Sequence, residues 1–177
     1  FTVSDGNGGT ASQTITVAIA PDIDNITIEL RWGVAPTDLD SHLTGPTVGL
    51  DGRFHVYYAS RNYYDNDGSL AANLAADDVT SYGPELTTIY DRTPGSYLFY
   101  VYNFSGESPL AGSEATVTVR DTLSGLDQTY AISADATGQY WSVFQLTIDA
   151  NGVATLTEIN QYSESVPADP EDTGEAL

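Results

Sequence analysis

The sequence contains neither cysteine nor lysine, and its basic side chains are five arginines and two histidines. Without cysteine, disulfide bonds and thiol chemistry are excluded. The 25 acidic residues give a formal net charge of −20, so the chain lacks the basic surface that would neutralise nucleic-acid phosphates or anionic lipids. We therefore expect no nucleic-acid partner and no membrane insertion.

Long apolar runs are also missing. None approaches the roughly 20 residues of a membrane-spanning helix, and residues 1–19 lack the basic start of a signal peptide. The 41% of hydrophobic residues are mainly Val, Ile, Leu and Tyr, which favour strands, and Gly, Asn and Asp interrupt them throughout. A chain of 177 residues is long enough for one domain with a real core.

Apolar and polar residues alternate in short segments along most of the chain, which predicts strands. Asn151-Gly152, between the last two segments, is a strong hairpin signal. Strands at this spacing, without convincing helices, predict an all-β fold, an antiparallel β-sandwich of Ig-like or jelly-roll type. The expected strands are 26–32, 53–58, 86–90, 96–104, 115–120, 128–132, 140–148 and 153–159.

Segments outside these strands divide the chain. Residues 1–24 predict a terminal hairpin around Gly6–Gly9 and a linker, and a lone hairpin is marginal unless it belongs to a larger unit. Residues 25–161 form the main domain. Residues 162–177 are acidic and aperiodic, which predicts a linker or a disordered tail. Residues 61–85 predict a long functional loop, in which Leu70–Ala76 could form one helical turn.

The most informative stretch is Asp38-Leu39-Asp40-Ser41-His42-Leu43. Alternation along an extended backbone puts Asp38, Asp40 and His42 on one side. Two converging carboxylates repel each other unless a cation lies between them, and Ca²⁺ prefers such oxygen ligands. The alternative is a solvated acidic strand end.

Further acidic residues follow. Asp77, Asp78 and Glu85 flank a Gly83-Pro84 turn, while Asp65-Asn66-Asp67-Gly68 resembles the start of a calcium loop but lacks the later ligands of an EF-hand. Because cysteine is absent and there are only two histidines, zinc is disfavoured. The sequence predicts a Ca²⁺ site with candidate ligands Asp38, Asp40, Asp65, Asp67, Asp77, Asp78 and Glu85.

Four phrases in this order, LRWGVAPTDLDSHLTGP, FHVYYASRNYY, DDVTSYGPE and GSYLFYVYNFSG, resemble the peptide-binding domain of bacterial RTX adhesins and the wider YfaP-like group of β-sandwich domains. FTVSDGNGGTASQTITVAI resembles the closing hairpin of their cadherin-like or Ig-like extender repeats. The resemblance implies a type I secreted, extracellular adhesin on the bacterial cell surface, in which this domain is a monomeric module of a long chain.

The resemblance also implies a function. A Ca²⁺-dependent pocket would capture the C-terminal peptide of a cell-surface protein, and so mediate cell adhesion and biofilm formation. Its metal side would fall on Asp38, Asp40, Asp77, Asp78 and Glu85; Ala75 stands where the family pattern has a carboxylate.

The peptide side of such a pocket has candidates in residues 61–85. Arg61 could bind a carboxylate through two hydrogen bonds, and Tyr63, Tyr64 and Tyr82 could line side-chain pockets. Alternatively, these tyrosines cover the loop over the core.

Other classes remain open. The runner-up is a Ca²⁺-dependent lectin that binds glycans, followed by a purely structural extender. An enzyme is not expected: paired carboxylates suit a glycosidase, but acidic pairs arise by chance in this composition, and there is no G-x-S-x-G motif.

Overall fold

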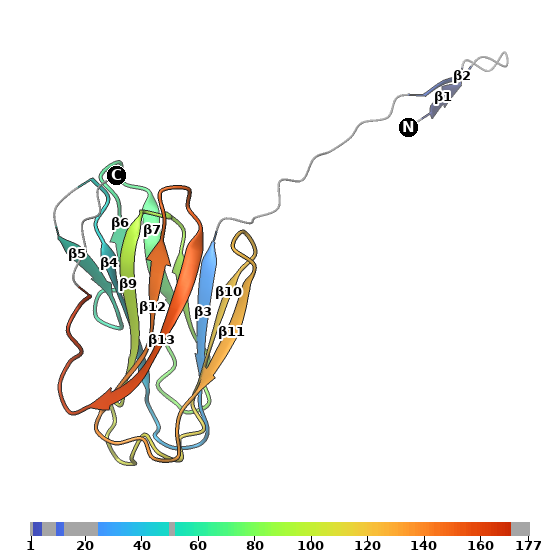
Figure 1. Ribbon diagram of the computed structural model, residues 1–177. Coiled ribbons are helices and arrows are strands. Elements are labelled where there is room, and N and C mark those ends of the chain that lie inside the picture. The colour runs from blue at the N-terminus through green and yellow to red at the C-terminus, as the bar shows by residue number, and fades with distance from the viewer. Residues whose placement is uncertain (1, 5–9, 13–24, 50–51, 171–177) are drawn as a thin grey trace.

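The computed structural model describes residues 2–4, 10–12, 25–49 and 52–170 (Figure 1). Every regular element among them is a β-strand, and none is a helix that could cross a membrane. The strands are β1 Thr2–Ser4, β2 Thr10–Ser12, β3 Ile26–Arg31, β4 Asp40–Pro46, β5 Arg53–Val56, β6 Asn62–Tyr64, β7 Leu70–Ala76, β8 Glu85–Ile89, β9 Gly95–Tyr102, β10 Thr116–Asp121, β11 Leu126–Ala131, β12 Tyr140–Ile148 and β13 Ala154–Ser163.

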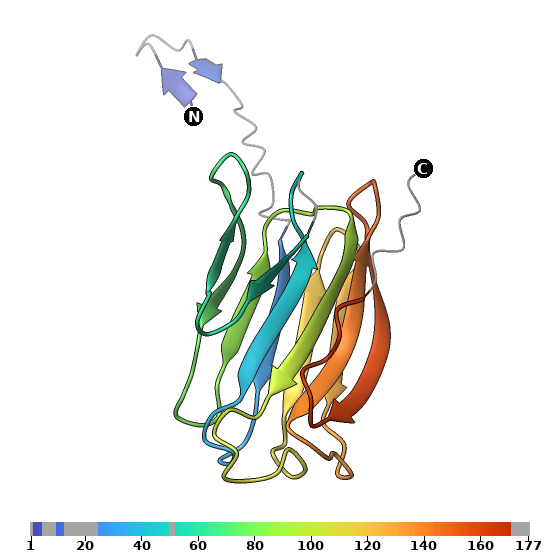
Figure 2. The same ribbon diagram turned by 90° about the vertical axis from the view of Figure 1, so that its left-hand side faces the viewer.

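Two antiparallel sheets face each other in a sandwich (Figures 1 and 2). The six-stranded sheet has the order β11-β10-β3-β8-β7-β6, and the five-stranded sheet has the order β13-β12-β9-β4-β5. The predicted all-β antiparallel sandwich is confirmed. The strands β1 and β2 form a separate hairpin in which Thr2 pairs with Ser12, whereas the Gly6–Gly9 turn and most of the predicted linker lie outside the described residues.

Period-two alternation explains the core. In β3, Ile26, Ile28 and Leu30 are fully buried, and Arg31 at the strand end is exposed. From the other sheet, residues such as Phe99 and Trp141 pack into the same cluster between the sheets. Burial of each such side chain contributes roughly 1.5–3 kcal/mol, so the alternation also fixes which face of each strand points inward.

Strand β9 lies between β12 and β4 in the five-stranded sheet and is buried on both faces. Phe99 belongs to the core between the sheets, whereas Leu98 and Tyr100, on the outer face, are also buried. The C-terminal tail, defined as residues 164–170, lies over this outer face (Figure 2). It lines a groove with Leu98.

The Asp169 side chain fixes the end of the tail. The Asp169 carboxylate accepts a hydrogen bond from Thr44 Oγ1 and lies 3.3 Å from Arg53 Nε. The described part of the predicted linker is therefore packed on the domain; residues 171–177 lie outside the described residues.

The segment 61–85 differs from its prediction. It contains the β6–β7 hairpin and the loop 77–84, rather than one long irregular loop. Leu70–Ala76 is strand β7, not a helical turn, because it pairs with β6 on one side and β8 on the other. Pairing and the burial of Leu74 override the helix propensity of its alanines and leucines. Thr44, Gly45 and Pro46 are the last three residues of β4.

Strand pairing defines two ends of the sandwich. At one end, Asp40 pairs with Tyr102 and Glu85 pairs with Leu30, so the loops 32–39, 77–84 and 103–115 lie together; we call it the acidic end. At the opposite end lie the turn 65–69 and the loops 90–94 and 149–153.

Candidate metal centre

Four carboxylates meet at the acidic end because of where their strands begin or stop. Asp40 is the first residue of β4 in the five-stranded sheet, with Asp38 two residues earlier. Glu85 is the first residue of β8 in the six-stranded sheet, and Asp77 directly follows β7. The cluster therefore bridges the two sheets.

The cluster is compact and largely shielded from solvent. One carboxylate oxygen from each of Asp40, Asp77 and Glu85 lies within 4.8 Å of the others. The exposed fraction is 2% for Asp40 and 0% for Glu85. Because Ca²⁺–oxygen distances are about 2.4 Å, ligands on opposite sides of one ion lie about 4.8 Å apart. The three oxygens thus fit around a single ion.

Each of the four carboxylates has one oxygen that is buried without a hydrogen-bond partner. These oxygens are Asp38 Oδ1, Asp40 Oδ2, Asp77 Oδ1 and Glu85 Oε1. Unpaired buried anionic oxygens are costly, by several kcal/mol in an apolar environment. Protein groups satisfy the cluster only in part: the Ser41 amide donates to Glu85 Oε2 at 2.5 Å, and Arg61 Nη1 lies 3.9 Å from Asp77 Oδ2.

The pKa values of these carboxylates reflect the same cost of burying negative charge. Burial, followed by the charges of Asp38 and Asp77, raises the pKa of Asp40 to about 7. Burial above all raises the pKa of Glu85 to about 9. The pKa of Asp38 is raised by burial and then by neighbouring carboxylates. A cation among these groups would remove the penalty, because it stabilises every carboxylate in its charged form.

The remaining predicted ligands lie outside the compact group, which we define as Asp40, Asp77 and Glu85. They are Asp78, Asp65 and Asp67. Asp78 Oδ1 accepts the Thr80 amide at 2.7 Å and so shapes the loop 77–84, while its charge acts on Asp38. Asp65 and Asp67 lie in the β6–β7 turn, where Asp65 Oδ1 accepts the Ser69 amide at 2.9 Å. The seven residues of β7, roughly 20 Å, separate this turn from Asp77.

The four predicted peptide-binding residues differ in their surroundings. Arg61 donates to two backbone carbonyls at the end of β7, and Tyr63 stacks on Phe54 at 4.4 Å between ring centroids. Tyr64 is exposed on β6. Tyr82 is exposed in the loop 77–84. For Tyr63, the alternative of covering the core describes the structure better.

The two histidines lie apart from the carboxylates. His42 Nδ1 and His55 Nε2 hydrogen-bond at 2.9 Å on the outer face of the five-stranded sheet. Burial and then His55 lower the pKa of His42 to about 3. The donors of the compact group are therefore all oxygens.

The loop 103–115 supplies a residue that the sequence patterns did not indicate. Glu107 accepts a hydrogen bond from the Thr37 amide, and its charge raises the pKa of Asp38. Ser105 donates its amide to the Asp38 carbonyl at 3.3 Å. No motif marks Glu107 as part of the site, because its approach depends on the pairing of β9 with β4.

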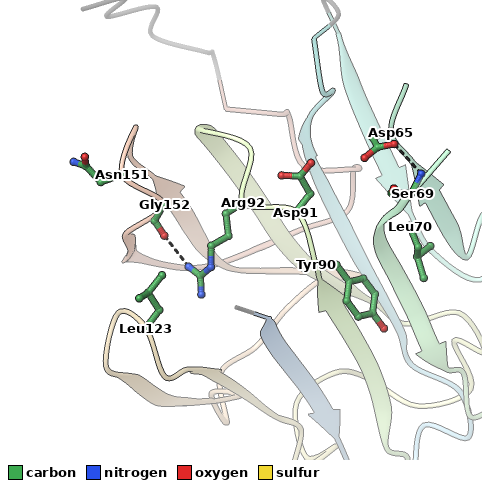
Figure 3. Close-up of a pocket in the computed structure, with 9 residues that line it drawn as sticks. All are labelled: Asp65, Ser69, Leu70, Tyr90, Asp91, Arg92, Leu123, Asn151 and Gly152. Carbon is green, nitrogen blue, oxygen red and sulfur yellow. Dashed lines mark hydrogen bonds between the residues drawn. The ribbon is translucent and has the colours of Figure 1, made fainter. Parts of the chain in front are cut away.

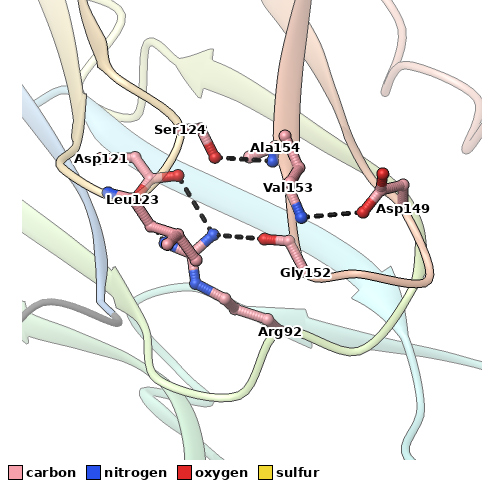
Figure 4. Close-up of polar contacts among 8 residues, drawn as sticks. All are labelled: Arg92, Asp121, Leu123, Ser124, Asp149, Gly152, Val153 and Ala154. Carbon is pink, nitrogen blue, oxygen red and sulfur yellow. Dashed lines mark hydrogen bonds and ion pairs between the residues drawn. The ribbon is translucent and has the colours of Figure 1, made fainter.

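A pocket at the opposite end contains an arginine whose bonds are structural (Figure 3). Arg92 lines it, but the guanidinium is committed to the protein: Nη1 donates to Asp121 Oδ2 at 3.1 Å and to the Gly152 carbonyl at 2.8 Å (Figure 4). These bonds tie the β8–β9 loop to the end of β10 and to the β12–β13 turn.

No protein-family model and no curated protein matches the chain. Two solved structures share its fold. One is a protein of unknown function, SAV2460, with a TM-score of 0.61 and 18% identity; the other is SCO6318 from Streptomyces coelicolor A3(2), described as a homologue of the telluride resistance protein TerD, with a TM-score of 0.59 and 20% identity. Each similarity covers 82% of this chain and 93% of the other.

These structures correct the family assignment. The resemblance to the peptide-binding domain of an RTX adhesin is wrong, and with it the assigned function in adhesion and biofilm formation and the lectin alternative. The misleading phrases cover β4, β6, most of β5, the central strand β9 and the loops beside them, and apolar strand segments joined by polar turns occur in many antiparallel sandwiches. The chain shares the fold of these two structures.

Proposed function

We propose that this chain is a divalent-cation-binding β-sandwich domain. Its site takes Ca²⁺ through Asp40, Asp77 and Glu85, with Asp38 beside them. The observation that supports this most directly is that Asp38, Asp40, Asp77 and Glu85 each have a buried oxygen without a hydrogen-bond partner, and that oxygens of the last three residues lie within 4.8 Å of one another. A bound cation would pair with these three carboxylates and offset their repulsion.

The donor set favours Ca²⁺ over other cations. The compact group contains only carboxylate oxygens, which suit hard cations, whereas zinc and copper favour histidine or cysteine. Mg²⁺ requires near-ideal octahedral geometry and retains several waters, which a largely buried group accommodates poorly. Ca²⁺ accepts irregular arrangements of six to eight oxygens, so carboxylates from separate strand ends can serve it.

The position of the group suggests what the ion does. Asp40 and Glu85 belong to different sheets, so an ion between them would link the sheets and fix the loops at the acidic end. In a chain without disulfides, such a link is an alternative staple. The calcium-binding region of this domain would then be formed by strand ends and the loop 77–84. This proposed role rests on the carboxylates and not on the description of the TerD homologue.

Isothermal titration with CaCl₂ tests the proposal. The wild-type chain should bind Ca²⁺, and Glu85→Gln should weaken binding at least about tenfold, because a charged ligand becomes neutral. The matched control is Asp65→Asn with Asp67→Asn, which removes two carboxylates from the opposite end and should leave the affinity unchanged. An unaltered isotherm for Glu85→Gln, or an equal loss in the control, would overturn this assignment.

A further inference from the structure

Large apolar side chains are exposed at the acidic end. Nine such residues have exposed fractions above 40% within the described chain, and five of them lie on loops or strand ends beside the carboxylates. We call these five the apolar rim: Val34 (68%), Tyr58 (42%), Val79 (55%), Tyr82 (59%) and Phe104 (50%). Exposed apolar groups that gather next to polar residues are typical of interaction sites.

Backbone contacts place the rim beside the carboxylates. Val79 directly follows Asp78 in sequence, and Phe104 precedes Ser105, whose amide donates to the Asp38 carbonyl at 3.3 Å. The rings of Tyr58 and Phe104 contact each other, with centroids 5.3 Å apart. The rim and the carboxylates thus share one end of the sandwich.

The loop that carries Tyr82 is held in a defined shape. The Tyr82 amide donates to the Gly33 carbonyl at 3.1 Å, and the Ser81 hydroxyl donates to the Val34 carbonyl at 2.9 Å. Ser81 and Tyr82 nevertheless have φ values of 81° and 70°, in the left-handed region that non-glycine residues rarely adopt. Such strain costs on the order of 1–3 kcal/mol per residue and clusters at functional sites. Here it presents a tyrosine to solvent.

The charge of this end indicates the kind of partner. The loops 32–39, 77–84 and 103–115 and the strand starts Asp40 and Glu85 carry seven carboxylates, and together these exceed the positive charge of Arg61 and one divalent cation. The face therefore stays negative with Ca²⁺ bound. The seven are Asp38, Asp40, Asp77, Asp78, Glu85, Glu107 and Glu114.

We propose that the apolar rim and these carboxylates form a docking surface for a polypeptide segment in which lysine or arginine residues alternate with apolar ones. Tyr82 and Phe104 would bury apolar partner side chains, since aromatic anchors dominate such interfaces. The carboxylates would attract the basic ones and set the register. A net charge of −20 disfavours both an anionic membrane and a second copy of the chain.

Fluorescence anisotropy with two labelled peptides of equal length and charge tests this surface. One peptide alternates lysine with phenylalanine, and the other alternates lysine with serine. In calcium and about 150 mM salt, where distant charges are screened, the wild type should bind the phenylalanine peptide at least about tenfold more tightly. The double variant Tyr82→Asn with Phe104→Ser should lose this preference; asparagine tolerates the left-handed conformation.

The control variant is Leu123→Ser with Val153→Ser, which removes two exposed apolar side chains from the opposite end and should keep the preference. Equal binding of both peptides by the wild type, or equal losses in both variants, would overturn the inference. So would rim-dependent binding to phosphatidylserine vesicles, which would assign the surface to membranes. A CaCl₂ titration of the rim variant separates this surface from the metal site, because the rim supplies no ligand and the isotherm should be unchanged.

Discussion

Asp40 and Glu85 begin strands in opposite sheets, yet oxygens of their carboxylates lie within 4.8 Å of each other with almost no exposure to water. The sandwich thus holds two like charges together across its own interface. Because this arrangement opposes folding unless a cation or protons are present, it leads to measurable expectations for stability.

Calcium should stabilise the folded chain. A site assembled from two sheets exists only in the native state, so ligand binding shifts unfolding by mass action, by about 2.7 kcal/mol at a hundredfold excess over Kd. Thermal melts with CaCl₂ and with EGTA measure the effect. Identical midpoints in the two conditions would refute it.

Asp40→Asn should change stability in opposite directions in the two conditions. In EGTA, the variant should melt at a higher temperature than the wild type, because a neutral amide no longer repels Asp38 and Asp77. In calcium, it should melt at a lower temperature, because a ligand is lost. Thermal melts of the variant and the wild type, in EGTA and in CaCl₂, measure both changes in melting temperature. A variant destabilised equally in both conditions would indicate a packing defect instead.

Without calcium, stability should fall as pH rises between about 5 and 9. The pKa values of Asp40 and Glu85 in the folded state, about 7 and about 9, lie above those of the unfolded chain. The folded state therefore binds more protons, so its advantage is complete below the unfolded pKa values and disappears as pH passes the folded ones. Melts in EGTA across this range give the slope. Glu85→Gln should flatten it, and a slope unchanged by that substitution would contradict the assignment.

The ion pair between Arg92 and Asp121 should contribute strongly to stability. Burial would raise the pKa of Asp121, but the hydrogen bonds from Arg92 and Ser124 outweigh it and lower that pKa. Asp121→Ala removes the carboxylate from the largely buried Arg92 guanidinium and should cost about 3–5 kcal/mol in urea unfolding. Asp127→Ala is the control, since its pair with Arg120 is exposed and should contribute less than about 1 kcal/mol. Similar losses in the two variants would show that the buried pair has no special weight.

Local patterns predicted most strands, because alternation and turn chemistry are properties of short segments. The alternating residues from Ile26 to Leu30 gave the buried face of β3, and Asn151-Gly152 gave the β12–β13 hairpin. Leu70–Ala76 was missed because its small and apolar residues suit a helix as well as a strand, and only the neighbouring strands decide between them.

The candidate site was predictable only in part for the same reason. Asp38, Asp40 and Glu85 stand in recognisable acidic motifs, but their convergence depends on pairings between distant segments. Glu107 joins them through such a pairing and carries no motif. Asp65 and Asp67 stand in an acidic motif as well, yet β7 carries them to the opposite end. Short phrases also misdirected the family assignment, since strand requirements recur in many sandwiches.

The path of the C-terminal tail has a mechanical consequence. Strand β13 ends at the acidic end, where Ser163 pairs with Tyr140, and the tail returns along the sheet to Asp169 beside Arg53, near the end at which β3 begins. Tension applied through Ile26 and Asp169 would therefore pull on one end of the sandwich. Such a force would detach the tail from the sheet contact by contact before it acted on the loops at the acidic end.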